Sequence, residues 1–244
     1  MMPTDTPPAG DPPGDRPDAA AHADKPAPLR VTTFTLGPHQ TNCYVLASGD
    51  RCWLIDAGFG AGAMSRHIRE QGLTPEALVL THAHVDHIGG VSEALAELDR
   101  KVPVWIHDDE AQWLNEPELN LSAKMGVPTT APGPDDTIAD GQELTLGSTT
   151  WKVLHTPGHS PGSVTLYCAA ADLAFVGDAL FNGSTGRWDF PTSNEANLRR
   201  SVTEVLFKLP PQTHVLSGHG DPTTIGHERE TNPVARDMWG WRPD

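Results

Sequence analysis

The chain has 244 residues, enough for one large domain with a substantial core, and its formal net charge of −15 at pH 7 is strongly acidic. This charge argues against nucleic-acid binding, which requires Lys and Arg to neutralise phosphates, and against docking on an anionic membrane surface. No stretch of the sequence is apolar for long enough to span a bilayer, so we expect no membrane contact. The three cysteines are well separated and form no metal-binding pair, which favours free thiols packed in the core of a cytoplasmic protein.

The first 28 residues differ in composition from the rest of the chain. They are dense in Pro, Ala, Asp and Gly, and after Met2 they contain no apolar side chain large enough to build a core. We therefore predict a disordered tail over residues 1–28 and a single folded domain over residues 29–244. The tail lacks the apolar core of a secretory signal and is too acidic for a typical transit peptide.

From residue 29 the pattern changes to short apolar runs separated by turn residues. In the first half these runs predict strands at 31–36, 43–46, 52–55, 77–80 and 102–106. The first three strands should form an antiparallel meander. Helices are expected at 61–71, 87–98 and 108–114. Residues 115–140 are rich in Pro, Gly and Asp and predict a long loop, which is either a functional lid or a plain connection.

The second half has a similar alternation of apolar runs and turns. It predicts strands at 144–146, 151–154, 164–168, 173–176 and 214–216. Thr192 and Glu195 form a capping box that opens a helix with one apolar face, and Arg199 and Arg200 lie off that face in solvent. Two strand-rich halves, each closed by helices, predict an α/β fold, a four-layer αββα sandwich with the histidine-bearing loops along one edge.

The segment Thr81–His87 reads Thr-His-Ala-His-Val-Asp-His and directly follows a predicted buried strand. Imidazoles and carboxylates at this density are the ligands that transition metals require. On extended backbone, residues two apart share a face, so His82 and His84 can bind one ion together. Asp86 and His87 point away from that pair and are better placed for a second ion. A solvated polar turn is the alternative, but four ligand-type residues in this order make it the weaker hypothesis.

Three further motifs place a ligand-type residue after a predicted strand and beside glycine. They contain His159 in Thr-Pro-Gly-His-Ser-Pro-Gly, Asp178 in Gly-Asp, and His219 in Gly-His-Gly. Each alone is a weak signal, because Gly-Asp and Gly-His-Gly sequences are usually turns or loops. Together with the first cluster they supply seven ligands, the number expected for two ions bridged by one carboxylate.

As a set these motifs resemble those of the metallo-β-lactamase superfamily, and within it the glyoxalase II-like hydrolases of the short bacterial form, which lacks a C-terminal helical domain. The resemblance covers nearly all of residues 29–240. It rests on Thr81–His87, Thr156–Ser163, Gly177–Arg187, Gly218–Gly220, Thr224–Gly226 and Glu230–Pro233. It implies the metallo-β-lactamase fold and assigns residues 29–244 to a metallo-β-lactamase-like hydrolase domain.

The resemblance also implies a role for each matching residue. The first metal would be bound by His82, His84 and His159, the second by Asp86, His87 and His219, and Asp178 would bridge the two. Asp86 and Asp178 would then be the catalytic carboxylates. The implied cofactors are two divalent ions per chain, with zinc the first expectation and iron or manganese suited to the same ligands.

Two positions outside the ligand set also match the family. Asp56 resembles an aspartate that orients ligands from beneath the site, although a plain turn at the end of a strand explains it almost as well. Arg187 matches a basic position that reaches the glutathione part of the substrate in relatives. Trp188 follows it where a small residue is expected, so the wall of the pocket should differ there.

The implied activity is hydrolysis of S-lactoylglutathione or a related hydroxyacylglutathione thioester by a hydroxide held between the two ions. A thiolate leaves readily, since a thiol pKa is about 8.5, and no strong general acid is required. The expected partner is therefore a small-molecule glutathione conjugate, and the chain should act as a monomer or homodimer. The absent helical domain predicts a shallower site with weaker or broader thioester specificity.

Other activities within the same superfamily compete with this one. A mono-iron persulfide dioxygenase would use His82, His159 and Asp178 as a two-histidine, one-carboxylate site, and the number of bound metals would discriminate. The residues after Asp178 differ from the Arg-Gly-Cys run of those dioxygenases. A β-lactamase with a cysteine ligand is disfavoured because Asp178 occupies that position. A lactonase is disfavoured because Tyr44 and Tyr167, the two tyrosines, lie on predicted strands.

Overall fold

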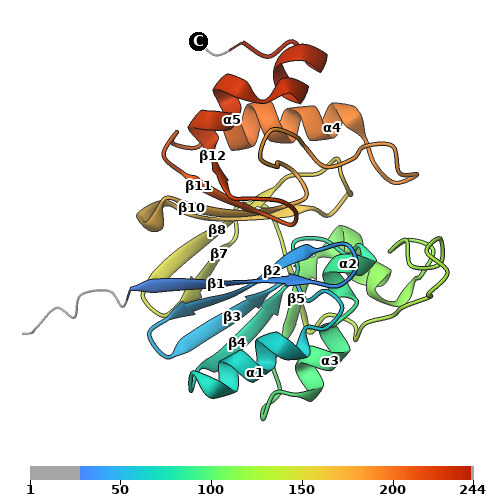
Figure 1. Cartoon of the computed structure of the whole chain (residues 1–244), viewed down its shortest axis with the longest axis vertical. Helices are drawn as coiled ribbons and strands as arrows, with labels where there is room; N and C mark the ends of the chain where they lie inside the picture. The colour runs from blue at the N-terminus through green and yellow to red at the C-terminus, as the bar shows by residue number, and fades with distance from the viewer. Residues whose placement is uncertain (1–27, 243–244) are drawn as a thin grey trace, which may run out of the picture.

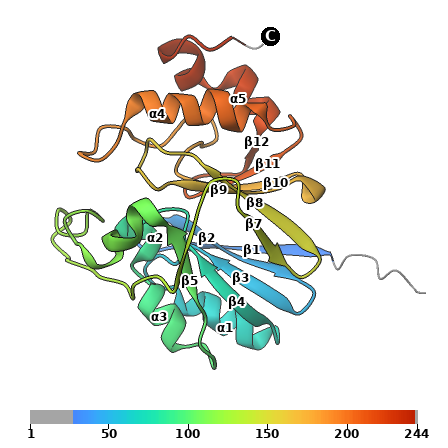
Figure 2. The same ribbon diagram turned by 180° about the vertical axis from the view of Figure 1, so that it is seen from behind.

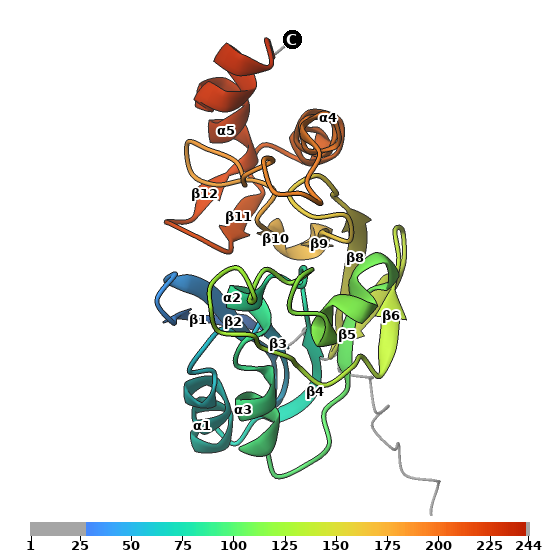
Figure 3. The same ribbon diagram turned by 90° about the vertical axis from the view of Figure 1, so that its right-hand side faces the viewer.

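The computed structural model describes residues 28–242, so the tail predicted over 1–28 lies outside the described residues except for Pro28. Within that range two six-stranded sheets stack face to face, and helices cover both outer faces (Figure 1). The same four layers, in the order helix, sheet, sheet, helix, are visible from the side in Figure 3. The predicted αββα sandwich is confirmed. No helix in residues 28–242 is both long and apolar enough to cross a membrane.

The first sheet is mixed. Its strands in spatial order are β1 (Leu29–Leu36), β2 (Thr41–Ser48), β3 (Arg51–Ile55), β4 (Thr74–Val79), β5 (Val104–His107) and β6 (Asp136–Ile138). The first three strands form the predicted antiparallel meander, and β3 to β6 pair in parallel. Helices α1 (Gly62–Glu70) and α3 (Val91–Ala96) lie over the outer face of this sheet (Figure 1).

The second sheet comes entirely from the later half of the chain. Its strands are β7 (Glu143–Leu146), β8 (Thr149–His155), β9 (Val164–Cys168), β10 (Leu173–Gly177), β11 (His214–Ser217) and β12 (Thr223–Thr224), in the spatial order β12-β11-β10-β9-β8-β7. Helices α4 (Glu195–Arg200) and α5 (Ile225–Thr231) cover its outer face, as the view from behind also shows (Figure 2). Neither β12 nor α5 was predicted from the sequence.

Central strands are buried on both faces because each lies between a helix layer and the other sheet. In β2, Cys43 and Val45 face α1 and α3, whereas Tyr44 and Leu46 face the second sheet. A third apolar cluster lies beneath α4 and α5 and contains Trp239. The three cysteines are free and buried, as predicted.

The helix predicted over residues 87–98 is wrong, because the chain forms two helices there: α2 (Val85–Ile88) and α3. Between them the N–H of Gly90 donates to Ala57 O at 2.8 Å instead of continuing a helical ladder. A Cβ at position 90 would lie 2.0 Å from Gly58 O. The break therefore lets the start of α3 pack directly on the loop that follows β3.

The predicted capping box at Thr192 is also wrong. Asn194 caps α4 by accepting the N–H of Asn197, and Glu195 Oε1 instead accepts the indole N–H of Trp239 at 3.1 Å. After α4 the chain continues in helical form as a π-helix (Ser201–Val205) and a 3₁₀ turn (Leu206–Lys208). A second 3₁₀ helix (Asp108–Asn115) follows β5, where a short helix was predicted. The loop predicted over 115–140 contains β6, which extends the first sheet.

Candidate metal centre

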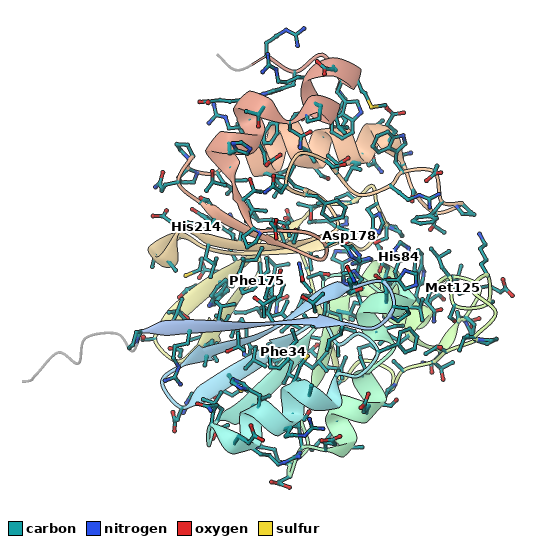
Figure 4. The ribbon with its side chains drawn as sticks, viewed as in Figure 1. Phe34, His84, Met125, Phe175, Asp178 and His214 are labelled. Atoms are coloured by element: carbon teal, nitrogen blue, oxygen red, sulfur yellow. The ribbon has the colours of Figure 1, made fainter. Side chains whose placement is uncertain are left out.

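Four loops meet at one edge of the sandwich, between the two sheets. They follow β4, β8, β10 and β11, and each carries one of the four predicted motifs. Figure 4 shows His84 and Asp178 at this edge, on the same side of the molecule as Met125. The fold thus brings together all seven predicted ligand residues, although they are spread over 138 positions from His82 to His219 (219 − 82 + 1).

Three imidazoles form what we call the histidine cluster: His82, His84 and His159. One ring nitrogen from each lies within 4.8 Å of the others, and all three side chains are buried. His84 Nδ1 and His159 Nε2 are 2.8 Å apart. Burial first, and then neighbouring imidazoles, lower the pKa of His82 and of His84, which keeps them in the neutral form that binds metals.

A second group, the aspartate cluster, consists of Asp86, His87 and His219. Asp86 Oδ2 lies 3.2 Å from His219 Nε2 and 3.5 Å from His87 Nε2. Burial has the largest single effect on Asp86 and opposes its ionisation, but His87 and the hydrogen bonds from His219 and Thr41 together hold the pKa of the carboxyl below its usual range. Asp86 is therefore a carboxylate, and Thr41 Oγ1 fixes it with a hydrogen bond of 2.8 Å.

Asp178 lies between the two clusters. Its Oδ1 is 3.4 Å from His87 Nε2, and its Oδ2 is 3.5 Å from both His159 Nε2 and His219 Nε2. This side chain is nearly buried, and the neighbouring imidazoles hold the pKa of its carboxyl well below the usual range in spite of burial. One carboxylate thus faces ligand atoms of both clusters.

The clusters contain buried polar atoms that have no hydrogen-bond partner within the described part of the chain. They are His82 Nε2, His84 Nε2, His87 Nε2 and Asp178 Oδ1. Burying such atoms unpaired is costly, and two of them, His87 Nε2 and Asp178 Oδ1, lie 3.4 Å apart, which indicates an absent ligand between them. Because the donors are imidazoles and carboxylates, divalent transition-metal ions fit them.

Hydrogen bonds on the far side of three of the rings, those of His82, His87 and His159, set their orientation. Asp56 accepts the Nδ1–H of His87 at 2.8 Å and both the N–H and the hydroxyl of Thr81. Since the Thr81 hydroxyl donates to Asp56, it accepts from His82 Nδ1 at 3.1 Å. Likewise His159 Nδ1 donates to Arg187 O at 2.9 Å. In each of these rings Nδ1 is used by the hydrogen bond and Nε2 remains available to bind a metal. Residues that hydrogen-bond to metal ligands commonly orient them in this way.

Glu110 is a fully buried glutamate on the 3₁₀ helix after β5, and it was not predicted as a site residue. Its two oxygens accept the N–H of Ala83 at 2.5 Å and the N–H of Gly162 at 2.7 Å. Burial raises the pKa of Glu110 to about 7. Glu110 joins the loop that carries His82 and His84 to the loop that carries His159. Only its position in an otherwise ordinary acidic run, Asp-Asp-Glu, could have pointed to it.

A pocket of about 410 Å³ opens onto the two clusters. Its apolar wall consists of Val85, Leu121, Met125, Phe181 and Phe190, and two cationic residues, Lys124 and Arg187, line it as well. Arg187 is exposed, forms a bidentate ion pair with Asp189, and lies 4.6 Å above the ring of Phe190. Trp188 packs against Trp239 instead of lining the pocket. Lys124 was not predicted, since a single lysine in a long loop gives no sequence signal.

Another group of ligand-type residues, His107, Asp109 and His155, lies apart from this pocket. The two imidazole rings stack with an angle of 10° between their planes and 4.3 Å between their centroids. Lone pairs in parallel planes do not converge on one ion. His155 Nε2 also donates to Pro161 O at 2.7 Å. This group is therefore a stacked pair with an acidic neighbour, and it does not have the geometry of the main site.

Comparison with known proteins gives the same family for most of the chain. Residues 36–219 match the model of the metallo-beta-lactamase superfamily. The probable metallo-hydrolase YqgX of Bacillus subtilis is 43% identical over 84% of this chain and 97% of its own length. The hydroxyacylglutathione hydrolase GloC of Haemophilus influenzae is 32% identical over 84% of this chain and 95% of its own.

Two solved structures are also similar. The BLEG-1 B3 metallo-beta-lactamase superposes with a TM-score of 0.80 at 40% identity, covering 84% of this chain and 99% of that one. TTHA1623, crystallised in a di-iron-bound form, superposes with a TM-score of 0.75 at 38% identity, covering 84% of this chain and all of that one (100%).

Proposed function

The chain belongs to the metallo-beta-lactamase superfamily, and on that premise we propose that it is a metal-dependent hydrolase that cleaves thioesters of the S-lactoylglutathione type. The convergence of unpaired His Nε2 atoms with Asp178 Oδ1 carries the metal-dependent part of the proposal. The thioester part is supported by the similarity to GloC along nearly the whole of both proteins.

In this mechanism the histidine cluster would hold one divalent ion and the aspartate cluster would hold a second. Asp178 would contribute to holding both ions. Bound there, such ions would supply Lewis acidity and lower the pKa of a coordinated water. The chain itself holds the ligands: Asp56 and Thr81 fix two imidazoles and Arg187 O fixes a third. Water adds to the carbonyl carbon, the C–S bond breaks, and the products are a carboxylate and a thiol. The thiolate is a good leaving group, so the pocket needs no strong acid.

The first experiment is hydrolysis of S-D-lactoylglutathione by the full chain, purified and loaded with zinc. We expect turnover that a chelator abolishes and zinc restores. A parallel assay with a chromogenic cephalosporin is informative because of the similarity to BLEG-1. Cleavage of the cephalosporin without cleavage of the thioester would overturn the proposal.

Counting metals separates the proposal from the one-ion alternative, a persulfide dioxygenase that uses His82, His159 and Asp178. In the fold these three lie beside Asp86, His87 and His219, which a one-ion site would leave without a role. We therefore expect two ions per chain by elemental analysis. One iron per chain, with oxygen uptake on a glutathione persulfide, would favour the alternative.

Arg187 is proposed as the residue that meets the glutathione part of the substrate. Its guanidinium lies at the edge of the pocket, where Asp189 holds it over Phe190. Replacing Arg187 with Ala should raise KM for S-lactoylglutathione several-fold and leave kcat nearly unchanged, because the contact forms equally in ground and transition states. Arg199, exposed on α4, provides the control Arg199→Ala. Equal KM values for the two variants in steady-state kinetics would remove Arg187 from the substrate site.

A further inference from the structure

A second hollow adjoins the metal pocket and is not used by the mechanism above. This groove, of about 470 Å³, is lined by Pro38, His39, Phe59, Val85, Ser122, Met125 and Val127. It shares His39, Val85 and Met125 with the metal pocket. Val85 stands in the chain between the ligands His84 and Asp86. The groove is therefore continuous with the site where the reacting carbonyl must lie.

The walls of the groove are mostly apolar and partly exposed, and His39 lies on the side that the groove shares with the metal pocket. Met125 is 43% exposed and Val127 is 61% exposed, and within residues 28–242 the remaining large hydrophobic side chain with comparable exposure is Met238. Leaving apolar side chains in water is unfavourable, and exposed ones gathered at a concave surface are typical of a binding site. Ser122 adds little polarity, because its Oγ accepts the N–H of Thr129 at 2.9 Å and so is used within its own loop.

Hydrogen bonds hold the loop that presents these side chains. The amide of Asn120 donates to Trp113 O and Thr129 O, each at 3.0 Å, and the N–H of Val127 donates to Ser122 O at 3.3 Å. Leu121, next in the chain, has a φ of +70°, a conformation that costs a non-glycine residue about 1 kcal/mol or more. These hydrogen bonds fix the loop in a strained conformation in which Met125 and Val127 are exposed. The groove is therefore formed by an ordered segment of the chain.

Charge is distributed unevenly between the two hollows. Lys124 and Arg187 line the metal pocket, whereas neither lines the groove, whose lining includes no Lys, Arg, Asp or Glu. A charged thiol such as glutathione would thus be directed to the side of Arg187 and Phe190. The other half of the same thioester, its acyl group, would extend toward Phe59 and Val127.

We propose that this groove is an acyl subsite, which takes an apolar acyl chain longer than lactoyl while the thioester carbonyl lies at the metal centre. The inference rests on the proposed thioesterase function and narrows its substrate class to glutathione thioesters of medium-chain aliphatic acids. Each methylene buried in the groove should raise kcat/KM, by up to about fourfold, until the groove is filled.

The test is a chain-length series of glutathione thioesters, from acetyl to octanoyl, with the full-length, zinc-loaded protein. We expect kcat/KM to rise at least about tenfold from acetyl to hexanoyl. Val127→Glu places a carboxylate at the groove and should reduce the hexanoyl-to-acetyl ratio at least about fivefold. Met238→Glu is the matched control, because Met238 is 62% exposed and Val127 61%, and it should keep the wild-type ratio.

Direct binding separates a failure of the groove from a failure of the proposed function. Octanoate, titrated calorimetrically into the zinc-loaded protein, should bind to the wild type and to Met238→Glu and more weakly to Val127→Glu. That pattern without thioester turnover would retain the groove and reject the thioesterase. A flat chain-length profile, or equal octanoate affinity in all three proteins, would overturn the acyl subsite. A third outcome would also overturn the acyl subsite. If Val127→Glu changed the oligomeric state in size-exclusion chromatography and left the chain-length profile unchanged, the groove would be a surface for self-association.

Discussion

Glu110 shows how one buried side chain can hold two ligand loops together. Its carboxylate accepts backbone N–H groups from Ala83 and Gly162, which lie close to His82, His84 and His159 in the chain. Burying a carboxylate costs free energy unless it is hydrogen-bonded. Here the hydrogen bonds come from the two loops that carry the histidine cluster, so they also fix the distance between these loops. We therefore regard Glu110 as a positioning residue for the histidine cluster.

Replacing Glu110 with Gln should weaken metal binding. The amide has one oxygen where the carboxylate has two, so one of the two N–H groups would face an NH₂ group and remain unpaired, at a cost of about 1–3 kcal/mol. We expect zinc affinity, measured by chelator competition, to fall roughly tenfold or more. Glu118→Gln, at an exposed position shortly after the same 3₁₀ helix, is the control. Indistinguishable zinc affinities for the two variants would mean that Glu110 does not position the cluster.

At the scale of elements, the break between α2 and α3 determines where the aspartate cluster lies. Helix α2 carries Asp86 and His87, and the two glycines after it let the chain turn against the loop that follows β3. That loop contains Asp56, which binds His87. The N–H of Gly90 donates to Ala57 O, next to Asp56, so the break holds the end of α2 against this loop.

Gly90→Ala tests this arrangement. The new Cβ would meet Gly58 O at 2.0 Å and Ala61 Cβ at 2.8 Å, so the backbone must shift. We expect a loss of about 1–3 kcal/mol in unfolding free energy by urea denaturation, as in other overpacked sites, together with weaker zinc binding. At Gly133 the nearest atom to an added Cβ is Asn115 Nδ2 at 3.7 Å, and Gly133→Ala serves as the control. Wild-type stability in Gly90→Ala would show that the close packing at this junction is not required.

At the scale of the whole molecule, the two clusters lie where the sheets meet, and their residues come from loops of both sheets. Asp86 and His87 follow the first sheet's β4, whereas His159, Asp178 and His219 follow strands of the second sheet. Ions bound by both groups would therefore link the two halves of the sandwich. The buried carboxylates of Asp56 and Asp178 and the partly buried carboxylate of Asp86 also concentrate negative charge there, which a cation would neutralise.

Removing metal should therefore destabilise the entire domain. With free zinc at about 100 times its dissociation constant, binding adds about 2.7 kcal/mol to stability. For a domain of this size that corresponds to a Tm higher by roughly 5–10 °C in scanning calorimetry. Asp178→Ala should have a Tm near that of the metal-free protein and respond little to zinc. A wild-type Tm that did not change on chelation would contradict the role of metal as a link between the sheets.

The sequence alone determined which kinds of side chain form the candidate metal site. Each motif is short and places histidine or aspartate near glycine at the end of a predicted strand, so it can be recognised without knowing the fold. It also determined the layers: alternating and doubly buried apolar runs identify strands, and two strand-rich halves must bury their faces against each other. Strand β2 is an example: its Tyr44 and Leu46 side chains pack on the second sheet, as expected for a strand that is buried on both faces.

Tertiary structure alone decided the features that depend on contacts between distant segments. Glu110 acts on residues 27 and 52 positions away, so nothing near it in sequence marks its role. The break at Gly90 packs against Gly58, which is more than 30 residues earlier in the chain. Helix α4 is capped by Asn194 and not by Thr192, and Glu195 is hydrogen-bonded to the distant Trp239. The proposed acyl groove combines residues 38, 39, 59, 85, 122, 125 and 127, which become one surface only after the chain folds.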